Sequence, residues 1–150
     1  MAALLASAAT EPPRVFDPDR MIRMTDCHSI LDVLRLIKHG GSEWASRYVS
    51  MWFDGTSNGW VLVYPLQETS EPYFDFMYTG ELAPQKVFSD LLAKYPQCRV
   101  MDWSVGRIAC VIVEDGEVEM LAEIIRAFTE AAWGQGVTVV DVSYEEMGRA

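Results

Sequence analysis

Hydrophobic residues recur along most of the chain with the spacing of helices and strands. The first such pattern predicts a helix, because its apolar positions fall on one face: Ile30, Val33, Leu34 and Ile37. Ser29 followed by Asp32 resembles a capping box at the start of this helix, and Gly40 is placed to end it. The first regular element predicted along the chain is therefore a short amphipathic helix that begins near residue 30.

The segment 42–53 fits two patterns. Its aromatic residues Trp44, Tyr48 and Trp52 have helical spacing, whereas Val49, Met51 and Phe53 alternate as they would in a strand. We favour a strand from about residue 47, because the turn-forming run 54–59 and the β-rich run 60–66 that follow predict a hairpin. A third strand is predicted over 73–78.

The second half of the chain predicts a helix, a hairpin, a helix and a strand. Pro84 and Pro96 bound the helix, whose inward face is predicted to be Val87, Phe88, Leu91, Leu92 and Tyr95. Strands 98–103 and 107–113 form the hairpin, and the nearly continuous apolar run of the second predicts burial on both faces. Helix 117–133 has its predicted inward positions at Val118, Leu121, Ile125, Phe128 and Ala132, and strand 137–142 ends the series.

The element order α-β-β-β-α-β-β-α-β predicts an α+β fold in two layers, with a mostly antiparallel sheet and helices packed on one face. The closing β-β-α-β part, about the last third of the chain, resembles half of a ferredoxin-like arrangement, a likeness of fold alone. Residues 1–24 are predicted to be a flexible tail because of their prolines, and 25–150 a single domain. Met1, Met21 and Met24 are alternative starts.

The composition is that of an ordinary globular protein, with 50% hydrophobic and 23% charged residues in 150. No apolar run approaches the roughly 20 residues that cross a bilayer, so we expect no membrane association. The formal net charge of −10 argues against direct binding of nucleic acid or an anionic membrane, because both require a basic surface. The charge favours a basic partner, or it serves solubility alone.

Residues that could perform catalysis or bind a cofactor form no recognisable motif. The three cysteines, Cys27, Cys98 and Cys110, have spacings of neither a zinc site nor a disulfide framework, so we expect reduced thiols and a cytoplasmic location. Cys27 and His28 are adjacent and their side chains should diverge, which disfavours a catalytic pair. We expect no cofactor and no metal, and the lack of a catalytic motif favours a protein without enzymatic activity.

Candidate binding residues are acidic or aromatic. Four acids gather where helix 117–133 begins: Glu114, Asp115, Glu117 and Glu119. Acids in a first turn are favoured by the helix dipole. Glu119, Glu123 and Glu130 form a stripe on that helix, which is either a solvated face or a docking face for a basic partner. Trp44, Trp52 and Trp133 are expected to be partly exposed, and tryptophan is a common interface anchor.

These features favour a non-enzymatic acidic binding protein that neutralises a basic protein, such as a toxin or nuclease. The chain is similar in general character to bacterial toxin-immunity proteins and other small acidic inhibitors, as a short, acidic, tryptophan-rich α+β domain. Two alternatives stay open. One is a small-molecule-sensing regulatory domain with a pocket between sheet and helices, and the other is a small enzyme that uses scattered carboxylates.

Overall fold

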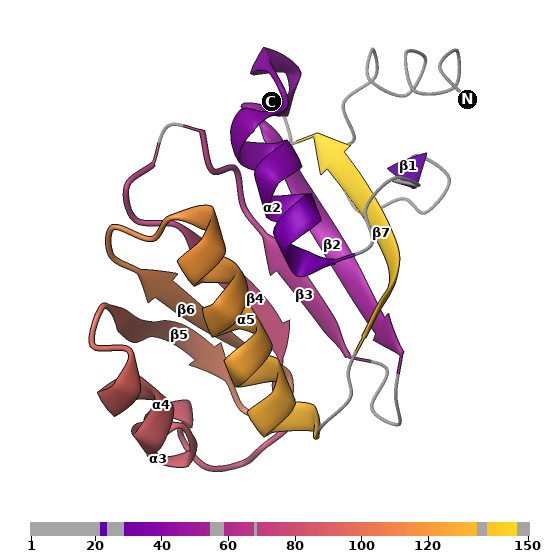
Figure 1. Cartoon of the computed structure of the whole chain (residues 1–150). Helices are drawn as coiled ribbons and strands as arrows, with labels where there is room; N and C mark the ends of the chain where they lie inside the picture. The colour runs from indigo at the N-terminus through magenta and orange to yellow at the C-terminus, as the bar shows by residue number, and fades with distance from the viewer. Residues whose placement is uncertain (1–21, 24–28, 55–58, 68, 135–137, 147–150) are drawn as a thin grey trace.

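The described part of the chain folds as two layers, a sheet of seven antiparallel strands and helices packed on one of its faces (Figure 1). The computed structural model describes residues 22–23, 29–54, 59–67, 69–134 and 138–146. The strands are β1 (Ile22–Arg23), β2 (Arg47–Asp54), β3 (Trp60–Val63), β4 (Tyr73–Met77), β5 (Cys98–Ser104), β6 (Ile108–Val113) and β7 (Thr138–Glu146). The helices are α2 (Ile30–His39), the short 3-10 helix η2 (Ser42–Trp44), α3 (Pro84–Val87), α4 (Ser89–Lys94) and α5 (Val118–Trp133). The predicted α+β class and element order are confirmed.

The strand order is β1-β7-β2-β3-β4-β6-β5. Strands β2, β3 and β4 form a meander, β5 and β6 add a hairpin beside β4, and α5 carries the chain back so that β7 pairs with β2. The segment that fitted both helix and strand is a strand from Arg47, as favoured. Alternation then decides its faces, because Val49, Met51 and Phe53 are buried toward the helices.

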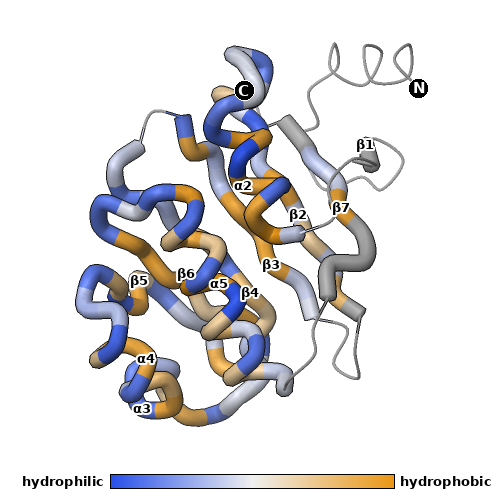
Figure 2. The backbone as a smooth tube through the Cα atoms, viewed as in Figure 1, coloured by the Kyte–Doolittle hydropathy of each residue, from blue (hydrophilic) through white to orange (hydrophobic). Residues whose placement is uncertain are grey.

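Helices α2 and α5 begin and end largely where the pattern predicts. The Ser29 hydroxyl accepts a hydrogen bond from the backbone N–H of Asp32, and Gly40 is the C-cap of α2. Figure 2 shows hydrophilic and hydrophobic residues interchanging along both helices, as expected of helices that cover a core. The predicted helix after Pro84 is instead two short helices that meet at Phe88, where the backbone departs from helical geometry.

That break at Phe88 corrects one predicted core residue. Phe88 and Tyr95 are buried, Leu91 and Leu92 are half-buried, but Val87 is 48% exposed. A single helix would have placed Val87 beside Leu91 on the inner face, whereas the change of direction turns it to the surface.

The core lies between the sheet and the helix layer and is rich in aromatic residues. Phe128 of α5 contacts Phe74, Phe76 and Phe88 with ring centroids 6.4, 6.2 and 5.3 Å apart. All four side chains are fully or almost fully buried. Four of the five predicted inward positions of α5 follow the pattern, since Val118, Leu121, Ile125 and Phe128 are buried and Ala132 is half-buried.

Strand β1 lies inside the segment predicted to be a tail, where Ile22 and Arg23 pair with Tyr144 and Ser143 of β7. The rest of that segment lies outside the described residues. We expect a chain that starts at Met21 to be as stable as the full chain, and one that starts at Met24 to lose about 1 kcal/mol with this pairing. Denaturant melts of the three chains test this, and an equal loss from both truncations would contradict it.

Buried hydroxyl and thiol groups predict that the fold weakens at high pH. The hydrogen bond from Tyr95 to Glu123, together with burial, raises the pKa of Tyr95 to about 12, and burial raises the pKa of the Cys98 thiol to about 11. Both ordinary values lie lower, at 10.0 and 9.0, so the fold favours the neutral forms. Their contribution to stability is complete below pH 9.0 and is lost as the pH rises through 11 to 12.

Denaturant melts at a series of alkaline pH values measure this loss. The variants Tyr95→Phe and Cys98→Ala should each show a shallower decline of the unfolding free energy than the wild type over that window. A wild-type decline that neither substitution changes would assign the effect to other groups.

Candidate binding surface

The face of the sheet opposite the helices, here called the open face, is formed by alternate residues of the strands and by Tyr64, which directly follows β3 and contacts the rings of Tyr48 and Tyr73. The cross-strand register arranges them in three rows. The first row is Tyr48, Tyr64, Tyr73, Ile112 and Arg99; the second is Ser143, Ser50, Leu62, Asp75, Cys110 and Asp102; the third is Trp52, Trp60, Met77, Ile108 and Ser104. Helices α2 and α5 lie on the other side (Figure 1), and none of the described helices packs on this face.

Three tyrosines stack across the first row. The rings of Tyr64 and Tyr73 are 4.5 Å apart between centroids, and those of Tyr48 and Tyr64 are 6.2 Å apart, both in stacked geometry. The three side chains are half-buried, because each ring covers part of its neighbour. Stacking holds the rings in place, so a partner that packs on them orders little that is not already ordered.

The tyrosine stack is tied to the middle row through Asp75. The hydroxyl of Tyr64 donates to Oδ2 of Asp75 over 2.8 Å. Burial, followed by this hydrogen bond, raises the pKa of Tyr64, so the phenol stays protonated as a donor. Asp75 is itself buried, because the larger side chains of the flanking rows cover the middle row.

The thiol of Cys110 lies beside Asp75 on the same row. Burial, and then hydrogen bonding to Asp75, raises the pKa of Cys110, which keeps the sulfur neutral. A nucleophilic cysteine needs the opposite shift, because the thiolate is the reactive form. The network is therefore suited to holding the sheet surface in one arrangement rather than to covalent chemistry.

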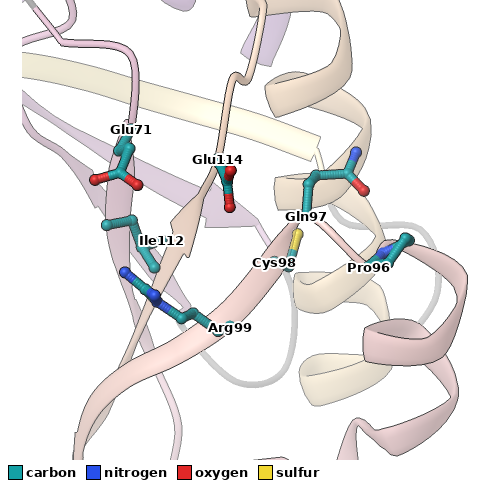
Figure 3. A pocket seen from close by; sticks show the side chains of 7 residues that line it. All are labelled: Glu71, Pro96, Gln97, Cys98, Arg99, Ile112 and Glu114. Atoms are coloured by element: carbon teal, nitrogen blue, oxygen red, sulfur yellow. The ribbon is translucent and has the colours of Figure 1, made fainter.

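One end of the open face carries a shallow cavity of about 60 Å³, drawn in Figure 3. Its lining includes Ile112 and Arg99 from the first row, together with Glu71 and Glu114. In Figure 3 the carboxylates of Glu71 and Glu114 lie above Ile112, and the side chain of Arg99 extends toward Ile112 from below. Of the acids predicted as binding residues, Glu114 is the one that belongs to this cavity.

Backbone hydrogen bonds hold the parts of this cavity together. The N–H of Val113 donates to the carbonyl of Pro72, that of Glu114 to Gln97, and that of Asp115 to Ser70. These bonds join three segments that are distant in sequence. Glu71 and Glu114 are therefore presented to solvent from a fixed backbone.

The other acids of this turn lie between β6 and α5. Asp115 is exposed and has a φ of 53°, the left-handed conformation, which an aspartate adopts more readily than most residues. Glu117 is the N-cap residue of α5, and its side chain makes no capping hydrogen bond. Both carboxylates are at the surface, and neither lines the cavity beside Glu114.

The predicted acidic stripe on α5 makes intramolecular contacts along its length. Oε2 of Glu119 is 3.5 Å from Nη2 of Arg35 on α2, and Oε2 of Glu130 accepts from Nε of Arg126 over 2.9 Å. Oε2 of Glu123 accepts a 2.7 Å hydrogen bond from the hydroxyl of Tyr95. Glu119 and Glu123 are exposed and Glu130 is half-buried. Because each of the three carboxylates already has a partner within the protein, it is less available to bind a cationic group of another protein.

The three tryptophans predicted to be partly exposed have different environments. Trp52 is 40% exposed on the open face, as predicted from its position opposite the inward residues of its strand. Trp133 is half-buried, since its ring packs on Phe53 and its Nε1 donates to the carbonyl of Met77 over 2.7 Å. The expectation for Trp44 is wrong, because its side chain is 7% exposed.

Trp44 is buried because the polar residues around it form η2, which turns the indole inward. Its ring lies edge-on to Tyr144, with centroids 4.9 Å apart, and the guanidinium of Arg47 lies 5.0 Å above it. A tryptophan in a polar stretch of sequence can therefore be part of the core, when a short helix turns its side chain toward the sheet.

Other candidate chemistries receive no support from the described part of the chain. It contains no cluster of His, Cys, Asp and Glu side chains that could hold a metal ion. None of its helices is long and apolar enough to cross a membrane. Cys27 and His28 lie outside the described residues.

Sequence reasoning missed the tyrosine stack, Asp75, Glu71 and Arg99. A signal for Tyr48 was present, because the alternation that buries Val49 and Met51 places it on the opposite face with Trp52. The neighbours of Tyr48 across the sheet depend on strand order and register, which the local pattern does not contain.

Comparison of the chain with protein-family models, curated proteins and solved structures gave no match. The inference of a function therefore rests on the geometry of the open face and on the net charge of the chain. Among the surfaces described, it is the one that combines stacked aromatic rings, an exposed tryptophan and free carboxylates at its end.

Proposed function

We propose that the protein is a non-enzymatic acidic binding protein that neutralises a basic protein partner, and that the partner docks on the open face. The observation that carries the proposal is the ordered aromatic surface of this face, with the stacked tyrosines in its first row and the exposed Trp52 in its third row. Tyrosine and tryptophan are enriched at the energetic centres of interfaces. None of the described helices covers them.

The charge of the chain favours a basic partner. A net charge of −10 attracts cationic proteins over long range and speeds their encounter. At short range, the aromatic faces of Tyr48, Tyr73 and Trp52 are surfaces on which arginine side chains of a partner can stack. Glu71 and Glu114 at the end of the open face provide carboxylates for a further cationic side chain.

A toxin or nuclease is the kind of partner this combination suits, because such enzymes carry basic surfaces for their anionic substrates. The proposal includes a cytoplasmic location, in keeping with thiols that are buried and reduced at Cys98 and Cys110. It includes no catalytic step, since the thiol of Cys110 is kept neutral and the Asp75 carboxylate is held by Tyr64.

Affinity capture from the native host, followed by identification of the retained protein, tests the proposal when combined with binding kinetics. We expect a basic protein whose association slows as the salt concentration rises, because screening at a Debye length of about 8 Å removes long-range steering. Its dissociation should change less. An acidic or neutral partner, or association rates that do not depend on salt, would overturn the proposal.

A pair of single substitutions locates the electrostatic part of the binding. Glu114→Gln removes a carboxylate at the cavity, whereas Glu43→Gln removes the exposed carboxylate of η2, on a different part of the molecule. Both change the net charge equally. We expect Glu114→Gln to slow association more than Glu43→Gln, and equal effects would remove the cavity from the proposed interface.

A further inference from the structure

A groove of about 310 Å³ lies between α3, the C-terminal end of α5 and the loop that follows β4. Its lining is largely apolar and includes Met77, Leu82, Val87, Phe88, Ala132 and Trp133. Leu82 is 64% exposed and Val87 is 48% exposed, which is unusual for large apolar side chains that lie together at a surface. The groove shares only Met77 with the open face, so it is a separate candidate site.

The groove is held in shape by hydrogen bonds that its own polar groups make to the backbone. Nε1 of Trp133 donates to the carbonyl of Met77, and the hydroxyl of Tyr78 donates to the carbonyl of Leu82. Gly80 allows this arrangement, because a Cβ there would lie 2.5 Å from the Tyr78 hydroxyl. The loop therefore closes tightly over Tyr78 and leaves the groove beside it.

The same hydrogen bonds decide which ligands the groove can recognise. Two side-chain donors of the lining, the indole N–H of Trp133 and the hydroxyl of Tyr78, already donate to backbone carbonyls, and the third, the hydroxyl of Thr79, carries no charge. Glu81 is the one charged residue of the lining, and its side chain is exposed. An anionic ligand would thus meet a carboxylate without a compensating cation, whereas a cation would meet its counter-charge.

We propose that this groove binds a small organic cation with an apolar body, such as a primary alkylamine. The apolar part would lie along Leu82, Val87 and Ala132, and the ammonium group would face Glu81. Sites for small molecules are typically concave, apolar and supplied with a few polar groups that fix orientation, and this groove is at the small end of their size range. This function is distinct from the binding of a protein on the open face.

Titration of the full chain with three compounds of equal length tests the proposal: hexylamine, hexanol and hexanoate. Chemical shifts of the Ala131 and Ala132 amides and of the Trp133 indole N–H report binding at the groove. We expect hexylamine to bind most tightly, hexanol less tightly, and hexanoate about tenfold more weakly than the amine, since an exposed carboxylate attracts one ion and repels the other. Equal affinities for the three compounds, or no binding, would overturn the proposal.

Three variants distinguish the contribution of the Glu81 charge to binding from that of the apolar wall of the groove, and both from unspecific effects of a substitution. Glu81→Gln should weaken hexylamine binding about threefold and leave hexanol unchanged, whereas Leu82→Ala should weaken both. Val105→Ala, which alters an apolar residue that is 61% exposed in the β5–β6 turn, should change neither. Amine binding that is unaffected by Glu81→Gln, or shift changes centred on the open face, would show that the groove is not the site. Neither result would bear on capture of a basic protein.

Discussion

Phe128→Ala is expected to cost about 3 to 5 kcal/mol of stability, because it removes the ring that joins α5 to the sheet. Phe128 is completely buried and contacts three other phenylalanines, two of them on β4 and one between α3 and α4. Its loss would leave a cavity at the point where all these elements meet. Denaturant unfolding monitored by circular dichroism measures the change in free energy.

Val87→Ala is the matched control for that measurement. The sequence pattern places Val87 on an inner face with Leu91, whereas the structure places it at the surface. We therefore expect this substitution to cost less than about 0.5 kcal/mol. A small loss for Phe128→Ala, or a large one for Val87→Ala, would mean that the helix layer packs differently from the structure described above.

The fold was predictable to the extent that its signals are local. The capping residue Ser29, the alternation in β2 and the apolar stripe of α5 each depend on neighbours within a few residues, and all three were read correctly. The break at Phe88 was not, because Leu91, Leu92 and Tyr95 continue the helical spacing beyond it. There the packing of Phe88 against Phe76 and Phe128 outweighs local helix propensity.

The candidate binding surface was less predictable, because it is assembled across strands. Asp75 is close to Tyr64 only because β3 and β4 pair in the observed register. The cavity at Glu114 likewise needs segments near Glu71 and Gln97 that meet through backbone hydrogen bonds. The sequence identified the acidic turn and Trp52 as candidates, but not which groups surround them.

The internal contacts of the α5 acids also change what a charge reversal on that helix would do. On the sequence alone, replacing Glu119 and Glu123 by lysine should barely alter folding. In the structure, Glu123 is the acceptor for the hydroxyl of Tyr95, which is 5% exposed, so Glu123→Lys would leave a nearly buried donor beside a cation. A loss of binding in such a variant would reflect structure as well as charge.

Trp52→Ala avoids that ambiguity and is expected to weaken binding of the basic partner about 30-fold or more, a loss of about 2 kcal/mol. The side chain of Trp52 is 40% exposed in the free protein and lies on the open face opposite Trp60 in the register. An exposed indole on a strand inside a paired sheet has a fixed backbone and loses its water on binding without a large entropic cost, which is how an interface anchor gains its energy.

The loss should arise chiefly in the dissociation rate, because removing a neutral side chain leaves long-range steering intact. Surface plasmon resonance with the captured partner separates the two rate constants, and thermal unfolding checks that the variant is folded. Met120→Ala is the matched control, since Met120 is also large, apolar and 37% exposed, but lies on α5 in the helix layer, on the other side of the sheet (Figure 1). Equal losses for the two variants, or a Trp52→Ala effect confined to association, would show that the open face is not where the partner docks.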